Sequence, residues 1–296
     1  MSIPESQLQT WSNQGAIVSA QNTHTSIRNA INVYQKWPTE ITYNAYLQGS
    51  YINATNIYSN SDVDLIVEMT FSFYSNLTHE EKVSLKLVPA TCEWKEFRSH
   101  VIAALIEYYG SNLIDTSGSK SVKVIPDSGR LKADVVIAAT YRHYENLSVR
   151  SEGITLWKLP NMSDQIINYP KLHINNGANK NSDRRTAGRY KPTIRIFKNA
   201  REKIYLNKPQ LKNKFPSYFI EGLLYNVPDE KYNSGSIQEQ FVDILNWLHC
   251  EIYSERVNNL ICQNEMHYLF GNSTVNWNIL DAREYIAELI ELWNNW

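Results

Sequence analysis

Two aspartates at the head of an apolar run limit most strongly what this chain can fold into. Residues 46–69 read YLQGSYINATNIYSNSDVDLIVEM, with Asp62 and Asp64 directly before the apolar residues. In a strand, residues two apart point to the same face, so both carboxylates are expected to project together near the strand's entrance. Two adjacent carboxylates raise each other's pKa unless a cation is present. Because Mg²⁺ prefers hard oxygen ligands, the pair predicts a metal-binding unit that also accepts phosphate oxygens of a substrate.

A Gly-Ser pair upstream and an aspartate downstream complete the expected site. Gly49 lets the backbone approach a phosphate closely, and the hydroxyl and amide of Ser50 can bind one. Two metal ions held about 4 Å apart for in-line phosphoryl transfer need a third carboxylate. Asp134 is the best candidate, because it is the buried-looking charge of the apolar strand LKADVVIAA. The alternative is a solvated strand edge or a turn, and the combination of the three features favours the metal site.

Composition and charge exclude several classes of protein. The chain has 296 residues and a mass of 34.3 kDa, which allows one large domain or two lobes. A net charge of −1 indicates no global basic field for nucleic acid. Three cysteines without a CxxC pair, and histidines without ligand spacing, predict neither a disulfide framework nor a zinc site. The polar start and the lack of a ~20-residue apolar run predict no signal peptide, no membrane contact and a cytoplasmic setting.

Hydrophobic periodicity divides the chain into a mixed α/β part and a helical part. The boundary is expected between residues 160 and 192, which gives a catalytic lobe over 1–170 and a helical lobe over 171–296. The segment 153–192 is expected to be rich in loops. Helices are expected over 23–36, 79–110 with a break near Pro89, 192–206, 216–227, 236–255 and 281–296. Strands are expected over 40–50 and 63–69, with two more over 121–144 joined by a turn at 126–129.

The order apolar-Gly-Ser, spacer, Asp-apolar-Asp-apolar resembles the signature of the polymerase-β-like nucleotidyltransferases. More narrowly, the segments LQGSYINATNI, SDVDLIV, ADVVIAATYR, RIFKNAR and PSYFIEGLLYNVP resemble the cGAS/DncV-like nucleotidyltransferases (CD-NTases) of bacterial anti-phage defence. The resemblance extends from about residue 20 to residue 293. It implies an α/β (α+β) fold, in which a polymerase-β-like nucleotidyltransferase lobe with a mixed sheet is followed by a helical C-terminal lobe that closes over the nucleotides.

The resemblance also assigns roles to single residues. It implies that Gly49 and Ser50 hold the donor triphosphate and that Asp62, Asp64 and Asp134 are catalytic and bind two Mg²⁺ ions, for which Mn²⁺ is a possible substitute. It further implies that Lys198 and Ser217 contact the phosphates of the donor. It also implies that Tyr218 stacks on a base and that Asn176 reads a base.

Three of these roles have structural alternatives. Lys198 is suited to phosphate as a point charge, and its alternative is a solvated helix residue. Tyr218 offers a face on which any base can stack, and its alternative is core packing beside Phe219. The Asn176 amide offers a donor and an acceptor to a base edge, and the resemblance implies a preference for uracil at this position. The amide can pair with adenine equally well. A second alternative is that Asn176 merely caps a turn before Gly177.

The implied activity is synthesis of a cyclic oligonucleotide second messenger from nucleoside triphosphates. A ribose hydroxyl attacks the α-phosphate and pyrophosphate leaves, and repetition of this step closes a cyclic di- or trinucleotide with at least one pyrimidine. The implied partner in CBASS defence is a downstream effector that binds this product. No zinc-ribbon insertion is present, so direct sensing of DNA or RNA is not expected. The alternatives are a linear-product transferase, either oligoadenylate synthase-like or one that modifies protein or RNA, and a catalytically silent nucleotide-binding sensor, against which the intact triad argues.

Overall fold

The computed structural model describes residues 2–15, 17–38, 41–57, 62–127, 130–162, 164–233 and 235–296. The chain forms two compact units, which we describe separately. The sheet unit comprises residues 16–52 and 60–171, and the helical unit comprises residues 1–15, 53–59 and 172–296. The division after residue 171 falls inside the expected interval. Residues 1–15 and 53–59 differ from the expectation, because they belong to the helical unit rather than to the sheet unit.

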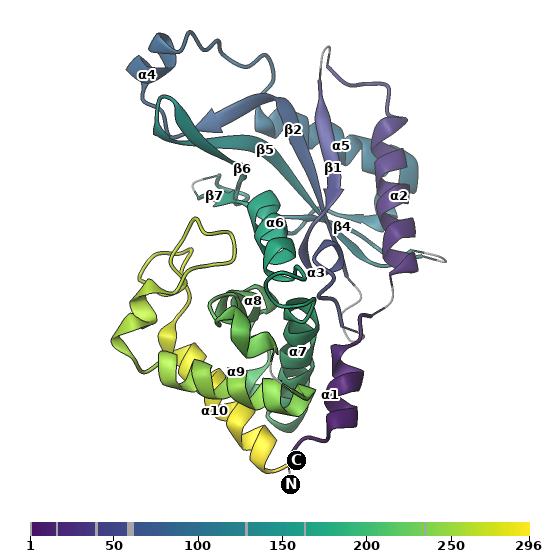
Figure 1. Ribbon diagram of the computed structural model, residues 1–296. Helices are drawn as coiled ribbons and strands as arrows, with labels where there is room; N and C mark the ends of the chain where they lie inside the picture. The colour runs from purple at the N-terminus through teal and green to yellow at the C-terminus, as the bar shows by residue number, and fades with distance from the viewer. Residues whose placement is uncertain are drawn as a thin grey trace. The chain divides into compact units, whose positions relative to one another are not determined.

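Seven strands of the described chain form one mixed sheet in the sheet unit (Figure 1). Strand β2 pairs with β5 in parallel and with β1 in antiparallel orientation, while β5 also pairs with β4 and β6. The order is β1-β2-β5-β4-β3, and β6 and β7 continue from β5. The strands are Tyr43–Leu47 (β1), Val63–Ser75 (β2), Ile114–Asp115 (β3), Val122–Val124 (β4), Ala133–Asn146 (β5), Val149–Trp157 (β6) and Gln165–Asn168 (β7). The predicted fold class, a mixed α/β lobe followed by a helical C-terminal part, is confirmed.

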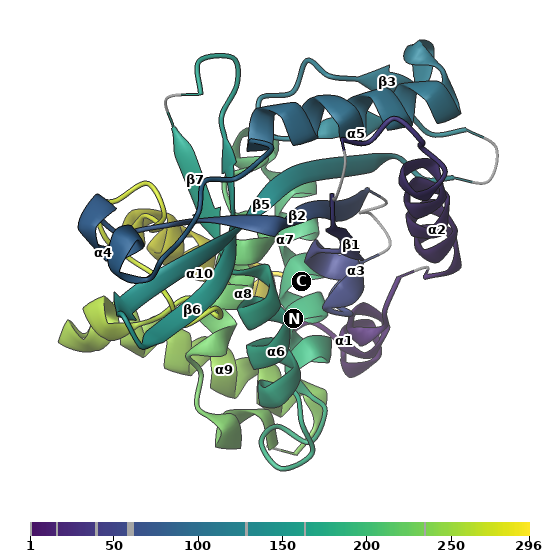
Figure 2. The ribbon, with the colours of Figure 1, turned by 90° about the horizontal axis from the view of Figure 1, so that it is seen from above.

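Two helices pack on one face of this sheet. Helices α2 (Val18–Asn32) and α5 (Trp94–Tyr109) contact each other and bury their apolar residues against alternate residues of β2 and β5 (Figures 1 and 2). Val63, Leu65 and Val67 belong to this core. Because side chains alternate along a strand, the residues between them point to the opposite face. That face carries a smaller cluster with Ile66, and it is the face toward which the aspartates point.

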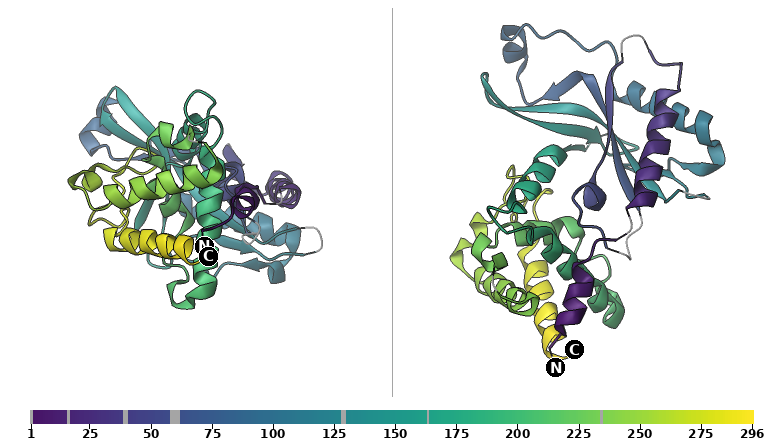
Figure 3. Two further views of the ribbon diagram at one scale, coloured as in Figure 1. Left: turned by 60° about the horizontal axis from the view of Figure 1, so that its bottom comes forward. Right: turned by 45° about the vertical axis from the view of Figure 1, so that its right-hand side comes forward.

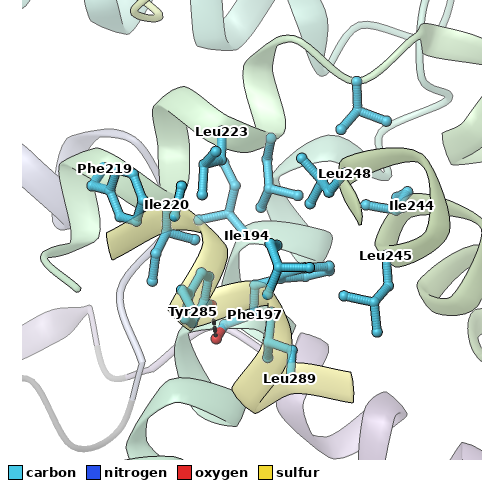
Figure 4. Packing of buried hydrophobic residues seen from close by; sticks show 14 of the residues in the cluster. Ile194, Phe197, Phe219, Ile220, Leu223, Ile244, Leu245, Leu248, Tyr285 and Leu289 are labelled. Carbon is cyan, nitrogen blue, oxygen red and sulfur yellow. Dashed lines mark hydrogen bonds between the residues drawn. The ribbon is translucent and has the colours of Figure 1, made fainter. Parts of the chain in front are cut away.

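The helical unit has its own core. Its longest helix, α7 (Tyr190–Asn207), packs against α8, α10 and the N-terminal α1 (Figure 3). Figure 4 shows this core, in which the hydroxyl of Tyr285 donates to the backbone oxygen of Phe197 at 2.9 Å. The remaining α-helices of the described chain are Glu5–Ser12 (α1), Gly49–Ile52 (α3), His79–Ser84 (α4), Pro170–Lys180 (α6), Ser217–Tyr225 (α8), Ile237–Glu251 (α9) and Ile279–Asn294 (α10), of which α3 and α4 lie in the sheet unit and α6 crosses the division. Among all these helices, none is long and apolar enough to cross a membrane.

The segment 153–192 differs most from the sequence-based expectation. The sequence predicts a segment rich in loops, but the structure contains most of β6, all of β7 and the helix α6 there. Pro170 is the first residue of α6, a position where the missing N–H of proline is tolerated. Asparagines and a glycine lower the helix propensity of α6, so its stability comes from tertiary contacts that local pattern does not show. The predicted turn at 126–129 lies partly outside the described residues.

Candidate active site

The backbone at Gly49 lies directly against the carboxylate of Asp64. Gly49 has φ +70°, and a Cβ built there would lie 2.4 Å from Asp64 Oδ2. The amide of Gln48 donates to the backbone oxygen of Asp64 at 2.9 Å, which fixes the start of α3 beside β2. Glycine is therefore required here both by backbone conformation and by space. Ser50 follows as the second residue of α3 and is half-buried.

The parallel pairing of β2 with β5 places two of the three predicted aspartates side by side. Asp64 and Asp134 are Cα partners in the register, and both are partly exposed on the face opposite to α2 and α5. Asp62 directly precedes β2, and its side chain is 40% exposed. The hydroxyl of Ser121 donates to Asp134 Oδ1 at 3.5 Å. The three aspartates thus occupy one end of neighbouring strands.

Lys132 was not identified from the sequence, although it lies among these aspartates. Its ammonium donates to Asp62 Oδ2 at 2.6 Å. The hydrogen bond to Asp62 raises the pKa of Lys132, partial burial lowers it, and the charges of Asp62, Asp134 and Asp64 raise it further. The positional signal was available, because Lys132 precedes Asp134 by the same two residues by which Asp62 precedes Asp64.

The carboxylates suit a hard divalent cation in type and position. Three aspartate side chains on one sheet face offer oxygen ligands and partial exposure to solvent, which is the donor set that Mg²⁺ prefers. Among the described residues, however, no group of three His, Cys, Asp or Glu side chains is gathered closely enough to hold a metal ion. One oxygen of Asp62 is engaged by Lys132 instead. The metal triad therefore stays a prediction that the donor chemistry supports.

Glu68 is a buried carboxylate on the same face of the sheet, and sequence alone does not indicate it. Glu68 lies four residues after Asp64 on β2 and is fully buried. It accepts hydrogen bonds from the hydroxyls of Tyr46 at 2.9 Å and Thr140 at 2.8 Å, and it pairs with the Lys171 ammonium at 3.0 Å. Burial and the charge of Glu68 raise the pKa of Tyr46 well above its ordinary value. These three partners satisfy the carboxylate and hold this face of the sheet together beyond the aspartates.

In the helical unit, Lys198 is buried and paired. Its ammonium donates to Glu221 Oε1 at 2.7 Å and to both the backbone oxygen and the hydroxyl of Thr55, at 3.2 and 3.1 Å. A lysine ammonium has three donors, so this arrangement uses all of them. The alternative of a solvated helix residue is wrong, because Lys198 is only 1% exposed. Its contact with phosphate stays a prediction, and it requires at least one of these bonds to be exchanged.

Glu221 is the centre of this buried network. It also accepts from Thr55 Oγ1 at 2.8 Å and lies 2.8 Å from His173 Nε2, which therefore carries the proton between them. Burial raises the pKa of Glu221, but the charge of Lys198 and the hydrogen bond from His173 outweigh burial and hold the pKa far below its ordinary value. Glu221 is therefore a buried carboxylate kept ionised by its partners, and the sequence alone did not identify it.

The predicted stacking residue lies beside this network. Tyr218 stacks on the ring of His173 with centroids 4.3 Å apart and an interplanar angle of 20°. It is half-buried, whereas the adjacent Phe219 is buried in the core of the helical unit. Ser217, the first residue of α8, accepts a hydrogen bond from Arg201 at 3.2 Å. Base stacking by Tyr218 and phosphate contact by Ser217 stay predictions.

Asn176 lies in a helix rather than in a loop. It falls within α6, and its side-chain amide donates to the backbone oxygen of Gln263 at 2.9 Å. The turn-capping alternative is therefore wrong. The adjacent Gly177 is tightly packed, since a Cβ there would lie 2.3 Å from Nε2 of the Gln263 side chain. The position of Asn176 is thus fixed by Gln263, and base reading stays a prediction.

The site residues divide between the two units. Gly49, Ser50, Asp62, Asp64 and Asp134 belong to the sheet unit. Residues Asn176, Lys198, Ser217 and Tyr218 belong to the helical unit. Within the sheet unit, the pairing of β2 with β5 sets Asp64 opposite Asp134, whereas in the helical unit each of the four residues has its own set of partners.

Comparison with known proteins yields a consistent set of relatives. Residues 175–294 match the family model of the cGAS/DncV-like nucleotidyltransferase C-terminal helical domain. The chain is 41% identical to a cyclic UMP-AMP synthase of Rhodothermus marinus over 100% of this chain and 99% of that protein. It is 36% identical to the cyclic nucleotide synthase CdnE01 of Staphylococcus haemolyticus over the full length of both.

Solved structures show the same relationship. The structure of the Rhodothermus marinus CdnE c-UMP-AMP synthase with Apcpp and Upnpp matches with a TM-score of 0.90 and 41% identity, over 99% of this chain and 97% of that one. The Elizabethkingia meningoseptica CdnE cyclic dinucleotide synthase with GTP and Apcpp matches with a TM-score of 0.78 and 25% identity, over 98% of both chains. The match therefore includes both units of the chain.

Proposed function

The chain belongs to the cGAS/DncV-like nucleotidyltransferases and is a cyclic oligonucleotide synthase, and we propose that its product is a cyclic dinucleotide with at least one pyrimidine base. The observation that carries this proposal is the 41% identity, over the whole chain, to a protein named as a cyclic UMP-AMP synthase. That relative's structure holds analogues of both an adenine and a uracil nucleotide. The amide of Asn176, the predicted base-reading residue, is compatible with the edge of uracil and equally with that of adenine, so the pyrimidine rests on the relative.

The residues of the sheet unit supply the proposed chemistry. Asp62, Asp64 and Asp134 would hold two Mg²⁺ ions, which when bound supply positive charge at the reacting phosphate. Gly49 brings its backbone against Asp64, where a larger residue would displace that carboxylate, and together with Ser50 it would hold the donor triphosphate. Attack of a ribose hydroxyl on the α-phosphate forms the new P–O bond, and pyrophosphate leaves with the electrons of the broken one. A second such step on the linear intermediate closes the ring.

The biological role we propose is a second messenger in anti-phage (CBASS) defence. The cyclic product would bind a downstream effector in the cytoplasm, and nucleoside triphosphates would be the substrates. Two relatives with solved structures were captured with nucleotides or their analogues, which supports triphosphate substrates. A cyclic product suits a messenger because it lacks the terminal phosphates that phosphatases remove.

Product analysis tests this proposal. Purified protein is incubated with the four labelled ribonucleotides and Mg²⁺ or Mn²⁺, and products are identified by mass spectrometry before and after phosphatase treatment. We expect a phosphatase-resistant cyclic dinucleotide that contains uridine or cytidine. A product that keeps a removable 5′-triphosphate would identify a linear-product transferase instead, and the absence of any product would favour a silent sensor.

The same assay tests the aspartates. The Asp62→Asn/Asp64→Asn double variant should make no product yet keep its fold, because removal of two like charges relieves repulsion. The control is Asp115→Asn on β3 of the same sheet, a carboxylate outside the triad, which should keep wild-type activity. Near-native product formation by the double variant would contradict the metal assignment.

A further inference from the structure

Lys132 brings a positive charge among the three aspartates of the sheet unit. Its ammonium lies 2.6 Å from Asp62 Oδ2. Lys132 precedes β5 just as Asp62 precedes β2, and the two strands run in parallel in the register that sets Asp64 opposite Asp134. The four side chains therefore extend from equivalent positions on one sheet face, three of them negative and one positive.

We propose that Lys132 is a built-in counter-ion of the aspartate triad, which holds Asp62 until a divalent metal ion displaces it and thereby weakens metal binding. The proposal rests on the proposed function, since it takes these aspartates as the metal ligands. Lys132 acts as a positioning residue through Asp62 and is not itself a catalytic group.

The exposure of the pair makes such an exchange feasible. The side chains of Lys132 and Asp62 are 39% and 40% exposed, so water can solvate both groups when they separate. Exposed ion pairs are weak, and a divalent cation offers Asp62 twice the charge of an ammonium. By contrast, the side chains of Lys198 and Glu221 are only 2% and 5% exposed, and the two groups could not separate without leaving a buried charge uncompensated.

The orientation of Asp62 supports the same conclusion. In the described part of the chain, the three carboxylates are not gathered closely enough for a metal ion, and Asp62 is directed to Lys132. Removal of the ammonium leaves three like charges on one face, which strengthens the attraction for a cation. Lys132→Met should therefore lower the dissociation constant for a metal ion about two- to fivefold, the range that corresponds to an exposed ion pair.

Direct metal titration tests this proposal without catalysis. Mn²⁺ alone is titrated into the full-length protein, and free Mn²⁺ is followed by its electron paramagnetic resonance signal. We expect tighter Mn²⁺ binding by Lys132→Met and by Lys132→Gln, and near wild-type binding by Lys132→Arg, which keeps the charge. The control is Lys36→Met, because Lys36 pairs with Glu107 at 2.8 Å in the same unit and its loss changes net charge equally. Melting temperatures confirm that each variant is folded.

Each result either supports or overturns the role of Lys132. Unchanged or weaker Mn²⁺ binding by both neutral variants would overturn it, as would an equal gain in Lys36→Met. A loss of nucleotide affinity at unchanged Mn²⁺ affinity would identify Lys132 as a phosphate contact and also overturn it. The Asp62→Asn/Asp64→Asn variant distinguishes failure of the metal site from failure of the counter-ion proposal. If that double variant binds Mn²⁺ as the wild type does, the assignment of the metal site is wrong. If it loses Mn²⁺ binding while Lys132→Met binds Mn²⁺ as the wild type does, only the counter-ion proposal is overturned.

Discussion

Replacement of Lys198 by methionine should destabilise the helical unit strongly, because it leaves a buried carboxylate without its main cation. Glu221 is 4% exposed, and its partners are Lys198 at 2.7 Å, Thr55 and His173. Methionine fills a similar volume but supplies neither charge nor hydrogen bond. Removal of one partner from a buried ion pair costs about 3–5 kcal/mol. We expect the lower part of this range, since His173 still donates to Glu221.

The matched control uses an ion pair of the same length at the surface. Lys208 lies 2.7 Å from Glu288 Oε2, the same distance that separates Lys198 from Glu221, but its side chain is 31% exposed. If burial decides the effect, Lys208→Met should barely change the melting temperature. For Lys198→Met, a loss of about 3 kcal/mol corresponds to a fall in melting temperature of roughly 6–12 °C at about 2–4 °C per kcal/mol.

The dependence on pH follows from the direction of the Glu221 shift. In the wild type the folded-state pKa of Glu221 is depressed, so its contribution to stability is present above the unfolded pKa and is lost as pH falls through the folded pKa. In Lys198→Met, burial is opposed only by the hydrogen bonds from His173 and Thr55, and the pKa of Glu221 rises. Proton uptake by Glu221 then relieves the buried charge, so the difference from wild type should shrink as pH falls from 7.5 toward about pH 5.

Thermal and urea unfolding between pH 5 and pH 8 measure these effects. The double variant Lys198→Met/Glu221→Gln should recover most of the lost stability at neutral pH, because it leaves no buried charge. If Lys198→Met melts like Lys208→Met, or if the double variant is less stable than the single one, the reasoning from buried charge is refuted.

Two further predictions concern the sequence-derived site residues. Gly49→Ala should reduce product formation by about 10²-fold, because its Cβ would displace the Asp64 carboxylate. The control is Gly188→Ala, at a glycine with a similar φ of +75° but no neighbour within 4 Å of a Cβ. Equal losses of activity in both variants would assign the effect to backbone strain. Asn176→Ser loses the reach to Gln263 and should shift incorporation toward purines when all four ribonucleotides are offered, whereas a product that is purine-only in the wild type and unaltered in the variant would contradict base reading.

The aspartates could be predicted from sequence because their information is local. A period of two sets Asp62 and Asp64 on one face of a strand, and the apolar run after them indicates a buried strand. The pairing of β2 with β5, which sets Asp64 opposite Asp134, has no local signal. The sequence therefore indicated that Asp62 and Asp64 share a face, and the sheet register shows that Asp134 and Lys132 lie on the neighbouring strand beside them.

The loop-rich prediction for residues 153–192 was wrong for a different physical reason. Prolines and a polar composition mark turns in an isolated segment. Here β6 is held by β5 along most of its length, and Pro170 begins a helix instead of ending one. Both elements depend on partners outside the segment, so local propensity was outweighed by pairing and packing.

Lys198 shows how a residue type can be assigned from sequence while its environment cannot. Its partner Thr55 is 143 residues away, and no periodicity in α7 indicates that a lysine there should be buried. All three ammonium donors are in use, so a phosphate contact would have to replace a bond to Thr55 or Glu221. The loss of stability is smaller if Lys198 keeps its bond to Glu221 and exchanges a bond to Thr55. An uncompensated buried carboxylate costs more free energy than an unpaired hydroxyl. A loss of nucleotide affinity in Lys198→Met would therefore report a phosphate contact only when Lys198→Met/Glu221→Gln, with stability restored, shows the same loss.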